Sequence, residues 1–140
     1  MTNQHDFATL AVHAGEAACK ATGALDTPIY QSTTFVSVDS DDMAAVYGGE
    51  KFGYMYTRYG NPTIRALEEK MAALEGGEAA LATATGMAAI STAILGYIKA
   101  GDHVVSARSL YGAAYNFLNK KLPRMGASAT FVPSTRVEDF

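Results

Sequence analysis

The sequence predicts an α/β chain in which an extended N-terminal arm precedes the first part of a parallel sheet. Two observations support this prediction. Residues 1–60 contain short apolar pieces separated by turn-forming residues, without a clear helical or strand period. From Asn61 onward, short apolar strands alternate with segments of helical period, which is the pattern of βαβ units.

The arm, residues 1–60, is expected to lie on another domain or on a neighbouring subunit. Turn formers such as Gly23, Pro28 and Gly49 interrupt it, and one short helix is predicted over residues 41–47. A long irregular segment cannot bury its own apolar groups, so a second surface has to cover them.

The α/β part, residues 61–140, begins with a well-marked helix. Asn61 suits the N-cap position, and Pro62 suits the first helical position. Gly76 and Gly77 then end the helix. Its apolar face is formed by Ile64, Leu67, Met71 and Leu74.

Two further helices and three strands are expected after this helix. Their predicted order is strand Ala79–Thr83, helix Met87–Lys99, strand His103–Ser106, helix Tyr111–Lys121 and strand Ala129–Val132. Three short parallel strands would leave sheet edges uncovered, and no closing element follows Val137. The sheet is therefore expected to be incomplete, as in the front part of a longer α/β protein.

Composition excludes several classes of function. The 140 residues carry a net charge of −3, which does not favour a nucleic-acid partner. The start lacks the pattern of a signal peptide, and no apolar run reaches the roughly 20 residues of a membrane span. Cys19 is the single cysteine, and the three histidines are too scattered for a metal site. We therefore expect a cytoplasmic protein without a metal, nucleic-acid or membrane partner.

The turn at Thr85, Gly86 and Met87 lies between a predicted strand and a predicted helix. The first backbone N–H groups of a helix lack intrahelical acceptors and, together with the helix dipole, favour an anion. Gly86 has no side chain to block a close approach. The turn is a candidate phosphate site, and a plain packing turn is the alternative.

Tyr111 and Arg58 are the other candidate ligand contacts. Tyr111 follows the strand His103–Ser106, at the sheet edge where ligands of parallel sheets bind, and its ring is either a stacking surface or a partly buried helix start. Arg58 lies between Tyr56 and Tyr59. Its guanidinium suits phosphate or carboxylate, and the alternative is a surface arginine stacked on tyrosine.

Five stretches together resemble the Cys/Met-metabolism (trans-sulfuration) family of pyridoxal-phosphate (PLP) enzymes. Tyr54–Thr63, a Tyr-x-Arg followed by Gly-Asn-Pro-Thr, is similar to the family signature. Ala84–Ile90 is similar to its phosphate loop, and Leu110–Gly112 to its ring-stacking motif. Thr9–Gly15 and Pro28–Thr33 also match. The resemblance covers nearly the whole chain.

The resemblance implies the start of the fold-type I, aminotransferase-like large domain and a homotetramer built from tight dimers. It implies that Gly86 and Met87 bind the phosphate of pyridoxal 5'-phosphate through backbone N–H groups. Tyr111 would stack on the pyridine ring as a catalytic and cofactor-binding residue. Tyr56 and Arg58 would reach the phosphate held by the neighbouring subunit.

The implied activity is γ-replacement on an O-acyl-homoserine with a sulfur nucleophile, as in O-acetylhomoserine sulfhydrylase. Methionine γ-lyase and cystathionine γ-synthase or γ-lyase are the alternatives within the family. Ala113 stands where methionine γ-lyases typically have cysteine, which disfavours that activity, and Ala114 also departs from the usual Gly, Cys or Thr. The family's Schiff-base lysine and its aspartate for the pyridine nitrogen fall beyond Phe140. A non-catalytic N-terminal fragment is therefore the alternative from another class.

Overall fold

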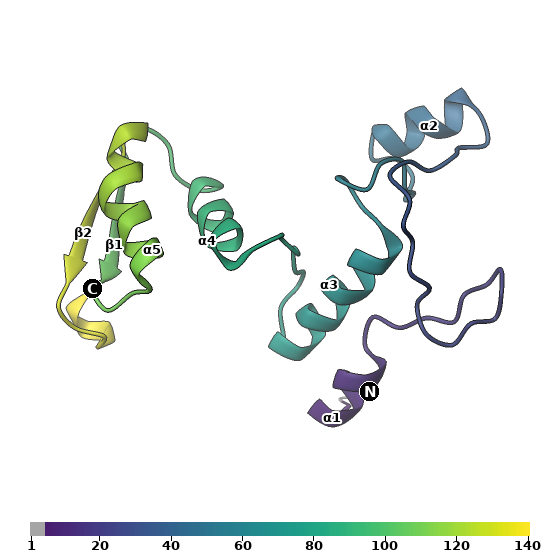
Figure 1. Cartoon of the computed structure of the whole chain (residues 1–140), viewed down its shortest axis with the longest axis horizontal. Coiled ribbons are helices and arrows are strands. Elements are labelled where there is room, and N and C mark those ends of the chain that lie inside the picture. Colours follow the sequence, from purple (N-terminus) through teal and green to yellow (C-terminus); the bar gives the residue numbers. More distant parts are fainter. Residues whose placement is uncertain (1–4) are drawn as a thin grey trace. The chain divides into compact units, whose positions relative to one another are not determined.

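The computed structural model describes residues 5–140, which form two units, one running to Ala82 and the other from Thr83 to Phe140 (Figure 1). The arm boundary that the sequence suggests at residue 60 stays a prediction. Among the described residues, every helix is too short or too polar to cross a lipid bilayer.

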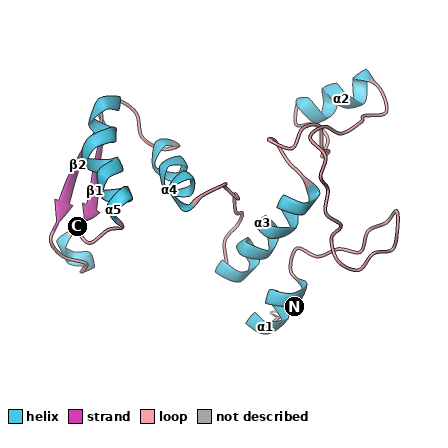
Figure 2. Ribbon diagram, viewed as in Figure 1, coloured by secondary structure: helices cyan, strands magenta, loops and turns pink. Residues whose placement is uncertain are grey.

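Helices and irregular segments make up the first unit (Figure 2). Its helices are α1 (Phe7–His13), α2 (Ser40–Tyr47) and α3 (Pro62–Glu75). The predictions for α2 and α3 are confirmed. The Asn61 side chain caps α3, Pro62 is its first residue, and Gly76 ends it in the left-handed conformation at φ 65°.

Helix α1 was not predicted, because its seven residues are too few to show a period. The Asp6 carboxylate caps it by accepting a hydrogen bond from the Thr9 N–H at 2.7 Å. The ammonium of Lys70 on α3 reaches the Val12 carbonyl at 3.3 Å and the Glu16 carboxylate at 3.1 Å. Contacts with α3 therefore hold a helix that local sequence alone would not sustain.

The second unit contains a βαβ arrangement. Its elements are α4 (Gly86–Leu95), β1 (His103–Ala107), α5 (Gly112–Asn116) with its π and 3₁₀ continuations Phe117–Lys121 and Leu122–Met125, β2 (Ser128–Val132) and a final 3₁₀ turn Val137–Asp139. Strands β1 and β2 are parallel, with His103 opposite Ser128. The predicted pairing of parallel strands across a helix is thus confirmed.

The core of this unit lies where the continuation of α5 packs against the strands. Leu118, Leu122 and Ala127 are buried, and Leu122 is fully inaccessible. Tyr115 and Phe131 stack beside them, with ring centroids 4.5 Å apart. This packing fixes the strand β1, after which Tyr111 is placed.

Two sequence predictions are wrong in detail. Residues 79–83 form no strand, and Leu81 there is 71% exposed, so the described residues contain a two-stranded sheet instead of a three-stranded one. A strand needs a hydrogen-bonded neighbour, and none pairs with this segment in residues 5–140. The helix expected to reach Lys99 ends at Leu95, with Gly96 as its C-cap residue, and the Lys99 N–H donates to the Asp102 carboxylate at 2.8 Å instead of continuing the helical pattern.

Candidate functional site

Arg58 packs against two tyrosine rings in the first unit. Its guanidinium carbon is 5.5 Å from the ring centroid of Tyr56 and 5.8 Å from that of Tyr59. Both rings attract the cation through their quadrupoles. Within residues 5–140, no carboxylate forms an ion pair with Arg58. Its fork of N–H donors is therefore available to an anion.

Backbone pairing fixes the position of the segment that carries Arg58. Tyr56 forms an antiparallel bridge with Thr34. Next to it, the Thr57 N–H donates to the Thr33 carbonyl at 2.8 Å. Arg58 thus follows directly after an anchored stretch of chain.

Asn61 and Thr63 have a structural role in the same motif. Asn61, which is 3% exposed, donates from Nδ2 to the Tyr30 carbonyl at 2.9 Å and to Thr57 Oγ1 at 3.2 Å. The Thr63 hydroxyl donates to the Pro28 carbonyl at 3.1 Å and accepts from the Tyr30 N–H at 2.9 Å. The Asn-Pro-Thr run therefore ties the arm to the start of α3. Its distant partners, some 30 residues away, give no signal in a local sequence pattern.

A surface pocket of about 330 Å³ lies beside Arg58. The sequence predicted Tyr56 and Arg58 as ligand contacts but not the other four residues that line this pocket. The lining residues are Met43, Tyr47, Met55, Tyr56, Arg58 and Tyr59. The spacing of Met43 and Tyr47, four residues apart on a predicted helix, is the signal that places both on one face.

The N-terminus of α4 carries Gly86 and Met87 in the second unit. Thr85 caps the helix, since its hydroxyl accepts from the Ala88 N–H at 3.1 Å. The N–H groups of Gly86 and Met87 precede the first intrahelical bonds and have no acceptor within the helix. A Cβ atom placed on Gly86 would meet no atom within 4 Å. Open space at the Cβ position of Gly86, next to two N–H donors without helical acceptors, is compatible with the approach of a phosphate group.

Tyr111 lies in the same unit as α4, between β1 and α5. Its side chain is 71% exposed, and its backbone carbonyl accepts from the Tyr115 N–H at 3.0 Å. The main chain is therefore fixed while the ring faces open space. Ala113 follows it, and the next residue, Ala114, is buried at 6% exposure.

The structure brings Tyr56 and Arg58 together in the first unit and places Gly86, Met87 and Tyr111 in the second. The ligand roles of these five residues stay predictions. No group of three or more possible metal ligands occurs in the part of the chain that the structure describes.

Known proteins match the chain along nearly all of its length. The profile of the family described as "Cys/Met metabolism PLP-dependent enzyme" matches residues 8–140. L-methionine gamma-lyase of Porphyromonas gingivalis is 47% identical over 133 residues, covering 95% of this chain and 33% of the relative. O-acetyl-L-homoserine sulfhydrylase of Leptospira meyeri is 42% identical, covering 94% of this chain and 30% of the relative.

Crystal structures of similar proteins agree with the fold. The metB protein of Corynebacterium glutamicum matches with a TM-score of 0.86 and 38% identity, over 97% of this chain and 34% of the other. The putative O-acetylhomoserine (thiol)-lyase of Campylobacter jejuni, described with a pyridoxyl-lysine monophosphate, matches with a TM-score of 0.89 and 27% identity, over 96% and 33%. The chain spans about a third of the length of these relatives.

Proposed function

Because the chain belongs to the Cys/Met-metabolism family of PLP-dependent enzymes, we propose that it supplies cofactor-binding residues to an enzyme of γ-replacement. The proposed substrate is an O-acyl-homoserine, whose acyloxy group is replaced by a sulfur nucleophile. The sulfhydrylase among the relatives supports this substrate class. The observation that carries the proposal is the capped, unobstructed N-terminus of α4.

In this proposal each candidate residue has one task. Gly86 and Met87 bind the cofactor phosphate through their N–H groups, because a helix N-terminus favours a dianion. Tyr111 offers its exposed ring to the pyridine and keeps it in one plane. Tyr56 and Arg58 bind the phosphate in the neighbouring subunit. When bound, the cofactor supplies the electron sink that γ-replacement requires.

A second copy of the chain is part of the proposal. Several arm residues expose apolar side chains to a degree that is unusual for a free surface, and a neighbouring subunit would cover them. They are Leu25, Ile29, Val36 and Val38, with Val36 fully exposed. This supports a homo-oligomer in which Arg58 serves the site of another subunit.

Methionine γ-elimination is the second candidate function. The relative from Porphyromonas gingivalis, at 47% identity, is an L-methionine gamma-lyase, which is the observation in its favour. Ala113, in place of the cysteine typical of that activity, is the observation against it. A non-catalytic fragment is the alternative from another class, since the chain spans a third of the length of its relatives.

The test uses the full-length protein that contains this chain, purified without cofactor and titrated with PLP. Gly86→Val adds a branched side chain next to the N–H donors and is expected to weaken PLP binding at least tenfold, about the value of one hydrogen bond to a charged group. Gly77→Val is the matched control, because its Cβ would make only an ordinary 3.5 Å contact with the Ala79 carbonyl oxygen.

Equal PLP affinity of the two variants would show that the turn is only a packing turn. The unsubstituted protein is then supplied with O-acetylhomoserine and sulfide, or with methionine alone. Homocysteine formation from the first mixture supports γ-replacement. Release of methanethiol from methionine, with no homocysteine from the first mixture, would instead establish the γ-lyase, and no turnover of either would favour the non-catalytic alternative.

A further inference from the structure

Tyr59 contacts both Tyr47 on helix α2 and the Arg58 guanidinium. Its ring centroid is 6.3 Å from that of Tyr47 on α2, with the two planes at 62°. It is 6.4 Å from the ring centroid of Tyr56, at 61°. Edge-to-face pairs of this geometry are attractive. Tyr56 and Tyr59 thus contact both Arg58 and each other, and Tyr47 contacts Tyr59.

Helix α2 presents a continuous face to this group. Met43 and Tyr47 are one helical turn apart, and both line the pocket beside Arg58. The returning chain also packs closely on the helix, since a Cβ atom on Gly53 would lie 2.7 Å from a methyl carbon of Val46. The segment that leads to Arg58 therefore contacts α2 at Gly53, and its residues Met55 and Tyr56 line one pocket with the helix.

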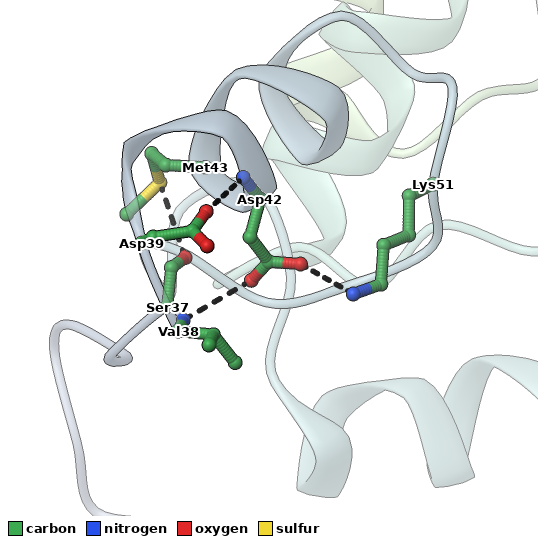
Figure 3. Close-up of polar contacts among 6 residues, drawn as sticks. All are labelled: Ser37, Val38, Asp39, Asp42, Met43 and Lys51. Carbon is green, nitrogen blue, oxygen red and sulfur yellow. Dashed lines mark hydrogen bonds and ion pairs between the residues drawn. The ribbon is translucent and has the colours of Figure 1, made fainter.

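A polar network fixes α2 to its two flanking segments (Figure 3). Asp39 caps the helix by accepting from the Asp42 N–H at 2.8 Å. The Asp42 carboxylate accepts from the Val38 N–H at 3.3 Å and forms an ion pair with Lys51 (Figure 3). One carboxylate thus joins the chain before α2 to the chain after it.

We propose that Tyr59 is a positioning residue for Arg58, and that α2, through Tyr47, holds Tyr59 in place. This inference rests on the proposed function, in which Arg58 binds the cofactor phosphate. A free arginine side chain samples many rotamers, and restricting them before binding lowers the entropy lost when the phosphate is bound. Tyr59 therefore contributes to cofactor affinity without contacting the cofactor.

The test is a double-mutant cycle in the full-length protein, with the dissociation constant of PLP measured by titration of the cofactor-free form. Tyr59→Leu removes the ring and is expected to weaken binding roughly three- to tenfold, the range of a partly exposed cation–π contact. Tyr59→Phe keeps the ring and is expected to stay within about twofold of the unsubstituted protein. In an Arg58→Ala background, Tyr59→Leu should cause no further loss.

One control variant and one further test variant accompany the cycle. Tyr97→Leu changes a tyrosine that is 91% exposed in the second unit and should leave the dissociation constant unchanged. Tyr47→Leu, one contact further from Arg58, should give a smaller loss than Tyr59→Leu, and that loss should also vanish in the Arg58→Ala background. This second variant keeps the test decisive if Tyr59→Leu folds poorly by circular dichroism.

Three outcomes would overturn the inference. An equal loss from Tyr59→Leu with and without Arg58 would show that Tyr59 acts independently of the guanidinium. A loss in Tyr59→Phe as large as in Tyr59→Leu would assign the effect to the hydroxyl. No loss in Tyr59→Leu would remove the positioning role. If Arg58→Ala leaves the affinity for PLP unchanged, Arg58 does not bind the phosphate, and the proposed function is contradicted. If Arg58→Ala weakens binding but Tyr59→Leu does not, only the positioning role of Tyr59 is contradicted.

Discussion

Substitution of Gly15 tests how the start of the chain is attached to α3. Gly15 has φ +73°, a conformation that residues with a side chain rarely adopt. A Cβ atom at this position would overlap the Ala66 carbonyl oxygen and lie 2.9 Å from the Lys70 backbone nitrogen. Both atoms belong to the backbone of α3, so no side-chain rotation can relieve the overlap. Gly15→Ala has to move the segment away from the helix.

The expected cost has two parts, and the chain offers a control for one of them. The left-handed conformation costs an alanine about 1–2 kcal/mol. Gly23 has the same φ of +73°, but a Cβ atom there would meet nothing within 4 Å. Gly23→Ala should therefore show the conformational cost alone. Gly15→Ala adds the overlap, for which overpacking against fixed atoms gives about 1–3 kcal/mol more.

Hydrogen exchange of the α1 amides is the direct assay, because Gly15 follows α1 closely in the chain and its contact with α3 helps to hold α1 against that helix. Gly15→Ala is expected to increase the exchange rates of residues 7–13 about fivefold or more, the equivalent of 1 kcal/mol of local opening. Gly23→Ala should leave those rates nearly unchanged. Equal rates in the two variants would refute the reasoning, because they would show that the close approach of Gly15 to α3 does not hold α1.

Two further predictions concern the core of the second unit and the ion pair of the first. Leu122→Ala empties a fully buried position and is expected to lower the free energy of unfolding by about 2–5 kcal/mol in urea denaturation. Val137→Ala, at a position that is 88% exposed, should change it by less than about 0.5 kcal/mol. The Lys51 ammonium, hydrogen-bonded to the Asp42 carboxylate, lowers the pKa of that carboxyl. The ion pair therefore stabilises the fold above the unfolded-state pKa of about 4, and this stabilisation is lost as the pH falls through the folded-state pKa. Amide protection of α2 should accordingly fall below about pH 4, and Lys51→Met should lower that protection at pH 7 and flatten the acid transition.

Local signals predicted the elements whose ends are marked in the sequence. Helix α3 has Asn61 and Pro62 at its start and Gly76 at its end, and the structure places all three as expected. Strands β1 and β2 are short apolar runs bounded by turn residues, and their parallel pairing follows from the helix between them. These predictions depend on residues within a few positions of each other.

Predictions failed where distant contacts decide the structure. The segment 79–83 is a short apolar run, but three of its five residues are alanines, which are not typical of strands, and strand formation depends on a partner that local sequence does not reveal. Helix α1 is stabilised by Lys70, which is 58 residues from the Val12 carbonyl that it contacts. The aromatic contact between Tyr47 and Tyr59 likewise joins α2 to a later segment. Each case needs tertiary contacts that no local pattern contains.

The motif from Tyr54 to Thr63 illustrates why a sequence pattern alone does not assign roles to its members. Asn61 and Thr63 use their polar atoms on the backbone of residues 28 and 30, inside the chain. Arg58 contacts two rings that attract its charge, and within residues 5–140 its guanidinium forms no ion pair with a carboxylate. A guanidinium has five N–H donors and no acceptor, so an anion is the partner that would satisfy the donors left over. Within this motif, Asn61 and Thr63 therefore hold the arm in place, whereas Arg58 has N–H donors that an anionic ligand could satisfy.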